Sequence, residues 1–171
     1  EACRPFDAAR DGVVMSGGAG ILLLEPLDAA LDRGAHIRAE IVGFGANSEG
    51  YDLVTPEPEG RHAAACMRQA LADARMPASA IDYVNAHGTG TVTGDAAEVH
   101  ALREVFGDAI PPVSSTKSMT GHAVGAAGAI EAIFCIGMLE RGFVAPSVNV
   151  SRLDQPSVTS RWCARPSSDR S

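Results

Sequence analysis

Residues 114–133 read SSTKSMTGHAVGAAGAIEAI and combine a lysine, a histidine and a glycine-rich run. Lys117 is the only lysine among the 14 lysine and arginine residues of the chain. Arginine stays protonated in proteins, whereas the pKa of a lysine responds to burial and to neighbouring charges. The segment therefore marks a candidate functional loop. The alternative is a surface lysine left over from an arginine-biased composition.

A second segment, residues 84–91, reads VNAHGTGT and places His87 among small and hydroxyl side chains. His87 and His122 each follow a short predicted strand and stand next to a glycine. Because ligands of α/β folds favour the crevice beyond the carboxyl ends of strands, we expect the two histidines to converge on one site. The alternative for each is a structural hydrogen bond in its loop. We assign that structural role to the other histidines, His36, His62 and His100.

These groups suit chemistry in which negative charge develops. Two neutral imidazoles with N–H groups aimed at one carbonyl oxygen would stabilise an enolate or an oxyanion. Lys117 would hold an imidazole neutral and add positive potential. Thr89 and Thr91 offer hydroxyls suited to an amide-rich arm, with simple turn chemistry as the alternative.

Glu131 lies on an otherwise apolar predicted helix, nine residues after His122. A carboxylate in such a place is costly unless it is paired or bound to a cation. Exposure of the side chain to solvent is the alternative. No pair of histidines has the spacing of a zinc site, and we expect no metal held by histidine.

The hydrophobic pattern predicts strands that alternate with helices. This order indicates an α/β fold with buried sheets. The predicted strands are residues 12–25, 36–47, 81–86, 112–116 and 143–150, and the predicted helices are residues 26–33, 62–75, 95–106 and 125–141. Residues 48–60 carry prolines, glycines and charges and predict a loop. Residues 155–171 lose all periodicity and are rich in serine and arginine, so we expect one domain over residues 1–154 followed by a disordered tail.

Composition narrows the classes of function. The net charge of −7 argues against binding of nucleic acid or of an anionic membrane surface. No apolar run reaches the roughly 18 residues of a membrane span. The cysteines are scattered without a CxxC pair, which fits a reducing cytoplasm rather than a zinc site or a disulfide framework. They are Cys3, Cys66, Cys135 and Cys163.

Three motifs together resemble the β-ketoacyl-[acyl-carrier-protein] synthases, the condensing enzymes of the thiolase-like fold. The motifs are CRPFDAARDG at residues 3–12, VNAHGTGT followed by GDAAE up to residue 98, and the quoted segment 114–133. The likeness runs from about residue 4 to residue 154. It implies the C-terminal half of that fold, a mixed sheet with packed helices, without its final strands. Residues 138–154, MLERGFVAPSVNVSRLD, are most similar to synthase I of fatty acid elongation, and a type II polyketide ketosynthase is less similar.

The resemblance implies a decarboxylative Claisen condensation. Malonyl carried on acyl-carrier protein loses carbon dioxide, and the resulting enolate attacks an acyl group held on a cysteine. His87 and His122 match the two histidines that stabilise the enolate and the tetrahedral oxyanion. Lys117 matches the lysine that supports them electrostatically.

The resemblance also assigns binding roles. Thr89 and Thr91 match hydroxyls that bind the phosphopantetheine arm of the carrier protein. Glu131, with Asn85 beside it, matches a structural carboxylate that helps to hold a monovalent cation. No other cofactor is implied. Acyl-carrier protein is the expected partner, and the intact family forms homodimers.

Two departures from the family pattern bear on activity. The nucleophilic cysteine of the family lies at a helix start in the preceding half, and no cysteine here takes its place. The glycine-rich loop that relatives carry near their C-terminus is also absent, and we hypothesise that residues 155–171 are a frameshifted or misassembled reading. We therefore expect a ketosynthase fragment that is inactive by itself. The alternatives are a non-catalytic subunit that binds acyl-carrier protein, a fragment of a polyketide ketosynthase and, more weakly, a thiolase.

Overall fold

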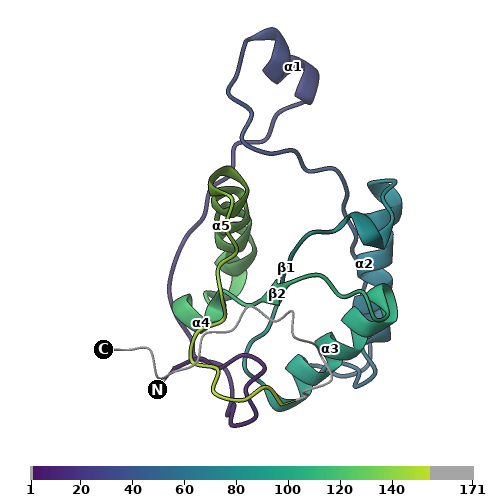
Figure 1. Cartoon of the computed structure of the whole chain (residues 1–171), viewed down its shortest axis with the longest axis vertical. Helices are drawn as coiled ribbons and strands as arrows, with labels where there is room; N and C mark the ends of the chain where they lie inside the picture. The colour runs from purple at the N-terminus through teal and green to yellow at the C-terminus, as the bar shows by residue number, and fades with distance from the viewer. Residues whose placement is uncertain (1, 155–171) are drawn as a thin grey trace.

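The computed structural model describes residues 2–154 of the chain (Figure 1). Its regular elements alternate along the chain. They are α1 (Leu27–Asp32), α2 (Arg61–Asp73), η1 (Ala78–Ala80), β1 (Val84–Asn85), α3 (Val92–Phe106), β2 (Val113–Ser114), α4 (Lys117–Thr120), η2 (Val124–Ala126) and α5 (Ala127–Arg141). The predicted disordered tail lies outside the described residues.

Strands β1 and β2 form a parallel pair at the centre of the molecule. Val84 pairs with Val113, and Asn85 pairs with Ser114. In Figure 1 helices α2 and α3 lie on one side of this pair, and α5 lies on the other. Because the strands are parallel, the segments that follow them start at the same edge of the sheet.

The apolar core lies between the strand pair and α3. It contains residues from the amino-terminal loop, both strand regions and α3. Its buried members are Phe6, Ala86, Val99, Leu102, Ile110 and Val113. Helix α3 buries this face because Val99 and Leu102 are three residues apart, on one side of the helix. The core thus packs the middle of α3 against the strand pair.

The four predicted helices are all present, with shifted ends. The helix predicted at 26–33 is the short α1, and the one predicted at 125–141 begins as the turn η2 and continues as α5. The strands predicted at 81–86 and 112–116 shrink to two residues each. None of the helices in residues 2–154 has the length and hydropathy of a membrane span.

The strand predicted over residues 143–150 was wrong. Within the described residues this segment has one bridge residue, Ser147, and no strand, and serine side chains link it to β2 and α4. Ser115 donates its N–H to Ser147 Oγ at 2.9 Å, and Ser114 Oγ donates to the Ala145 carbonyl at 2.5 Å. Val148 donates its N–H to Ser118 Oγ at 2.9 Å. Hydroxyl groups therefore replace the backbone ladder that the apolar pattern suggested.

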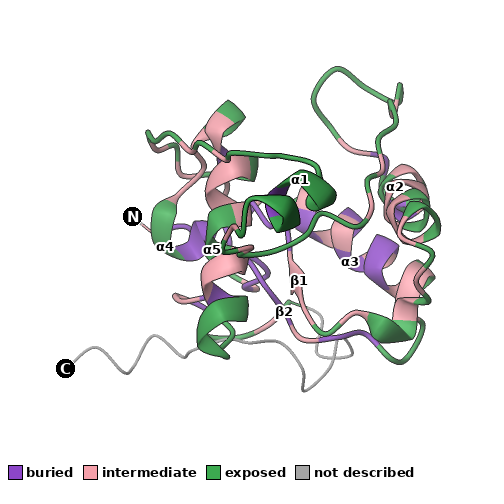
Figure 2. Cartoon of the chain, turned by 90° about the horizontal axis from the view of Figure 1, so that it is seen from above, coloured by how far each residue is buried: buried purple, intermediate pink, exposed green. Residues whose placement is uncertain are grey.

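The strands predicted over residues 12–25 and 36–47 were also wrong. Both segments are unassigned in the described structure, apart from one bridge between Met15 and His122. Their apolar side chains are exposed, with Ile21 at 91% and Phe44 at 73% of full exposure. Figure 2 shows the same exposure along α1 and the chain beside it. Both segments have the hydrophobic pattern of a paired strand. Apart from the bridge at Met15, no described segment forms a β-ladder with either of them.

Glycines hold these extended segments against helices. A Cβ added at Gly20 would lie 2.9 Å from the Cβ of Ala129 in α5. A Cβ added at Gly43 would lie 2.9 Å from the backbone nitrogen of Ala74, just after α2. Such distances are shorter than van der Waals contact, so each backbone approaches its helix as closely as only glycine allows.

We expect the substitution Gly43→Ala to destabilise the fold by about 1–3 kcal/mol, because the new methyl group overlaps the end of α2. The matched control is Gly137→Ala in α5, where an added Cβ meets nothing within 4 Å. That control should gain up to about 1 kcal/mol from helix propensity. Urea unfolding of the full chain measures both. Equal stability of Gly43→Ala and the unaltered chain would contradict the close approach.

Candidate active site

The two candidate histidines lie against each other. The ring centroids of His87 and His122 are 5.3 Å apart, and the rings meet edge to face at 86°. His87 follows β1, and His122 follows the short helix α4 after β2. The structure therefore brings together the histidines that were expected to converge, at the edge of the sheet where both strands end.

The backbone of His122 is held by the extended segment before α1. Its N–H donates to the Val14 carbonyl at 2.8 Å, and its carbonyl accepts the Ser16 N–H at 3.0 Å. Gly121 has φ +69, and a Cβ there would lie 2.9 Å from the Val14 oxygen. The segment that was predicted as a buried strand thus serves as the support of His122.

The imidazole of His122 is fixed in one tautomer. Val124 donates its N–H to His122 Nδ1 at 3.3 Å, so the neutral ring carries its proton on Nε2. Val124 adopts φ +50, which is unfavourable for a β-branched residue and costs about 1–3 kcal/mol. This strained turn aims an N–H donor at the ring, and it leaves Nε2–H free to donate elsewhere.

Glu98 in α3 holds the backbone of His87. One carboxylate oxygen accepts the His87 N–H at 2.7 Å, and the other accepts the Gly88 N–H at 2.8 Å. Burial raises the pKa of Glu98 to about 7, against the opposing effect of these two N–H donors. Sequence reasoning missed this role. The motif GDAAE could have indicated it, because it places the carboxylate of Glu98 in the second turn of the helix that follows the histidine loop.

Lys117 is buried, with 1% of its side chain exposed, and it forms an ion pair with Glu131 of α5. Glu131 is therefore paired with Lys117, which was one of the two alternatives for this carboxylate; the other was exposure to solvent. A buried charge needs such a partner, since leaving it unpaired costs several kcal/mol. The pair also connects α4 to α5.

The pKa of His87 falls from 6.5 to about 4. Burial is the main cause, followed by the positive charge of Lys117 and then by His122. His87 is therefore neutral near pH 7 and carries one N–H that can donate a hydrogen bond. The charge of Lys117 is thus the second cause of the low pKa of His87, after burial, and it acts in the direction that the sequence suggested.

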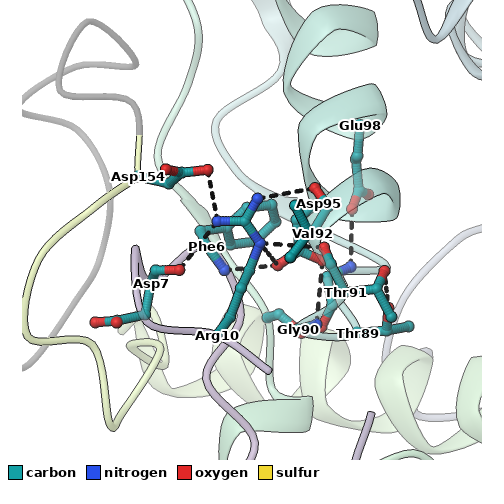
Figure 3. A network of polar contacts seen from close by, with 12 residues as sticks. Phe6, Asp7, Arg10, Thr89, Gly90, Thr91, Val92, Asp95, Glu98 and Asp154 are labelled. Carbon is teal, nitrogen blue, oxygen red and sulfur yellow. Dashed lines mark hydrogen bonds and ion pairs between the residues drawn. The ribbon is translucent and has the colours of Figure 1, made fainter. Parts of the chain in front are cut away.

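The two threonines form a hydroxyl pair beside the histidine loop (Figure 3). Thr89 Oγ1 and Thr91 Oγ1 are 3.1 Å apart. Between them, Gly90 has φ +83 and donates its N–H to Asp95 at 3.1 Å. The pair therefore lies on a tightly defined turn at the start of α3.

Asn85 is the residue whose surroundings fit a bound cation. Its amide nitrogen lies 3.4 Å from Thr116 Oγ1 and 3.7 Å from Cys135 Sγ, while its Oδ1 is buried without a hydrogen-bond partner. An orphaned amide oxygen suits an oxygen ligand of a monovalent cation. Glu131, the second expected ligand, already pairs with Lys117. Among the described residues, no group of three or more histidine, cysteine or acidic side chains could hold a metal ion.

The described cysteines are not set up as nucleophiles. Burial raises the pKa of Cys3 and of Cys135, which favours the unreactive thiol. Cys3 donates to the Thr89 carbonyl at 3.4 Å, and Cys66 donates to the Gly45 carbonyl at 3.1 Å. Cys163 lies outside the described residues.

Comparison with known proteins places this fold in one family. Residues 38–151 match the family model of the β-ketoacyl synthase C-terminal domain, and the chain belongs to the β-ketoacyl synthase family. The chain is 54% identical over 155 residues to 3-oxoacyl-[acyl-carrier-protein] synthase 1 of Haemophilus influenzae, and the match covers 91% of this chain and 37% of the relative. Synthase 1 of Escherichia coli strain K12 gives the same identity and coverage. The chain thus spans little more than a third of the length of these relatives.

Solved structures agree with this assignment. A structure described as the ishigamide ketosynthase/chain length factor superimposes with a TM-score of 0.91 at 39% identity, covering 96% of this chain and 40% of the other. A β-ketoacyl synthase from Burkholderia phymatum gives a TM-score of 0.78 at 42% identity, covering 96% and 38%. The predicted α/β fold of the thiolase-like class is therefore confirmed, as is the resemblance read from the motifs.

We expect His87 to stay neutral down to about pH 4, as measured by a ¹H–¹⁵N NMR titration of the full chain. Because the folded pKa lies below the usual 6.5, the folded state binds fewer protons than the unfolded state between these values. The contribution of His87 to stability is therefore complete above pH 6.5 and declines as the pH falls towards 4.

The substitution Lys117→Met should raise the pKa of His87, because it removes the neighbouring positive charge. It should not restore the ordinary value, because burial remains the larger cause. Arg68→Gln is the matched control, since it removes a positive charge from a surface pair with Glu104, keeps Lys117 with its partner and should leave the pKa of His87 low. A pKa of His87 that is equal in both variants would exclude the electrostatic role of Lys117.

Proposed function

We propose that this chain forms the decarboxylation site of a 3-oxoacyl-[acyl-carrier-protein] synthase that elongates fatty acids. The observation that carries the proposal is the pair of imidazoles 5.3 Å apart, with the pKa of His87 lowered to about 4. The neutral imidazole of His87, with the His122 ring against it and a buried ammonium group that lowers its pKa, suits a reaction that places negative charge on a carbonyl oxygen. His87, His122 and Lys117 are the proposed catalytic residues.

The proposed reaction begins with a malonyl thioester whose carbonyl oxygen lies between the two histidines. The bond from the α-carbon to the carboxylate breaks, carbon dioxide leaves, and the electron pair moves into the thioester as an enolate. N–H groups of His87 and His122 stabilise the enolate oxygen. The enolate carbon then attacks the carbonyl of an acyl group held as a cysteine thioester, a carbon–carbon bond forms, the carbon–sulfur bond to the cysteine breaks, and the cysteine thiolate leaves.

The substrate in this proposal is carried by acyl-carrier protein. Thr89 and Thr91 hold the phosphopantetheine arm with their adjacent hydroxyls, and Glu131 with Asn85 supports the site and a monovalent cation. One similar solved structure, 36% identical, is described as a type II polyketide acyl-carrier protein in complex with its ketosynthase. That complex supports a carrier protein as the partner. Cytoplasmic location and a homodimer of the complete enzyme belong to the same proposal.

The acyl group must come from a cysteine that the described residues do not supply, since Cys3 and Cys135 have raised pKa values. By itself the chain should therefore not condense acyl groups. Fatty acid elongation is favoured over polyketide synthesis, because identity is 54% to the synthase 1 relatives and 36% to the structure described as a type II PKS complex.

A chimera tests the function. The matched segment of the Haemophilus influenzae relative is replaced by the corresponding residues of this chain, and β-ketoacyl product is measured with malonyl-loaded and acyl-loaded carrier protein. We expect condensation by the chimera. We expect a loss of about 100-fold or more on His87→Ala or His122→Ala, since each removes a donor to the developing oxyanion.

His36→Ala is the control within the chimera, because His36 lies on the extended segment before α2, away from the paired rings. It should retain full activity. An active chimera that tolerates both His87→Ala and His122→Ala would refute the proposed roles. β-Ketoacyl product formed by this chain without the rest of the relative would refute the need for an external cysteine.

A further inference from the structure

Arg10 is a buried arginine that the roles above leave unused. Its side chain is 3% exposed and lies at the start of α3 (Figure 3). Its Nε donates to the Thr91 carbonyl at 3.1 Å, and one terminal nitrogen donates to the Val92 carbonyl at 2.8 Å. The other terminal nitrogen donates to the Asp7 carbonyl at 3.0 Å and to the Asp154 carboxylate at 2.6 Å.

Two of the carbonyl groups that Arg10 binds, those of Thr91 and Val92, belong to the turn that carries the threonine pair. Thr91 contributes one hydroxyl of that pair, and its own carbonyl is the acceptor of Arg10 Nε. Hydrogen bonds from a charged donor are stronger than those between neutral groups. The guanidinium, whose planar fork reaches several acceptors at once, therefore fixes the direction of the backbone at Thr91 and Val92.

Asp95 completes the same arrangement from the other side. Its carboxylate accepts the N–H groups of Gly90, at 3.1 Å, and of Phe6, at 2.7 Å, and it lies 3.6 Å from Arg10 Nε. The Gly90 carbonyl in turn accepts the Gly12 N–H at 3.0 Å. Both polar groups of Gly90 are thus held, and this residue separates the two threonines.

We infer that Arg10 is a positioning residue for the Thr89 and Thr91 hydroxyls, and that it sets the affinity for the phosphopantetheine arm of the carrier protein. This inference rests on the proposed function, which makes the threonines the arm-binding pair. Arg10 itself is buried and acts through the backbone of Thr91 and Val92. Its effect should therefore appear in binding of the arm and not in the tautomer of His122, which Val124 fixes.

The test compares the affinity of the full chain for acyl-carrier protein with the arm (holo) and without it (apo). The ratio of the two dissociation constants isolates the contribution of the arm from that of the carrier surface. We expect the unaltered chain to prefer the holo form. Thr89→Val with Thr91→Val should abolish the preference, and Arg10→Gln should reduce it at least tenfold while binding of the apo form stays unchanged.

Two further variants separate positioning from general stability. Arg10→Lys keeps the charge beside Asp154, but a single ammonium cannot reach both carbonyl groups, so the arm preference should fall while the unfolding transition stays close to that of the unaltered chain. This variant also decides the question if Arg10→Gln does not fold. Arg68→Gln removes an arginine that pairs with Glu104 on the surface, and it should keep the full preference.

The outcomes distinguish the two levels of the proposal. An unaltered chain that binds holo and apo carrier protein equally would contradict the proposed function and, with it, this inference. A preference that is lost in the threonine variants but kept in Arg10→Lys and Arg10→Gln would overturn only the role of Arg10. In that case the arginine would be a structural ion pair.

Discussion

The buried ion pair between Lys117 and Glu131 is the constraint around which the site is organised. An ammonium group with 1% of its side chain exposed is costly to bury without a partner, and Glu131 of α5 supplies that partner. The pair leaves enough positive potential at His87 to help lower its pKa. One interaction thus joins α4 to α5 and also adds to the effect of burial in lowering the pKa of His87, a proposed hydrogen-bond donor.

The two ends of the described chain close the site together. The Asp7 carboxylate accepts the N–H of Arg152 at 3.0 Å, and Arg10 reaches Asp154 from the same loop. These contacts join residues more than 140 positions apart in sequence. The loop that orients the threonine turn therefore depends on residues at both ends of the domain, and it cannot be completed before the chain reaches residue 154. Contacts of such long sequence separation are slow to form.

The sequence was sufficient for features that depend on local pattern. Helical periodicity located α2, α3 and α5, and the rule that loops after parallel strands share one edge led to the convergence of His87 and His122. It was insufficient where the outcome depends on a neighbour in space. Residues 12–25 have the apolar pattern of a buried strand. Whether their side chains are buried depends on which segment lies beside them, and the pattern does not contain that information. Arg10 donates to backbone carbonyl groups of another segment, and such acceptors leave no mark on residue type.

The arginine-rich composition has a consequence for the proteolysis and chemical labelling of this protein. The side chain of the single lysine, Lys117, is buried. A folded molecule therefore presents almost no ε-amino group to acylating reagents or cross-linkers. A lysine-specific protease has one peptide bond to recognise, between Lys117 and the buried Ser118. Cleavage there requires the segment around Lys117 to open, so the rate of digestion reports local unfolding of this segment.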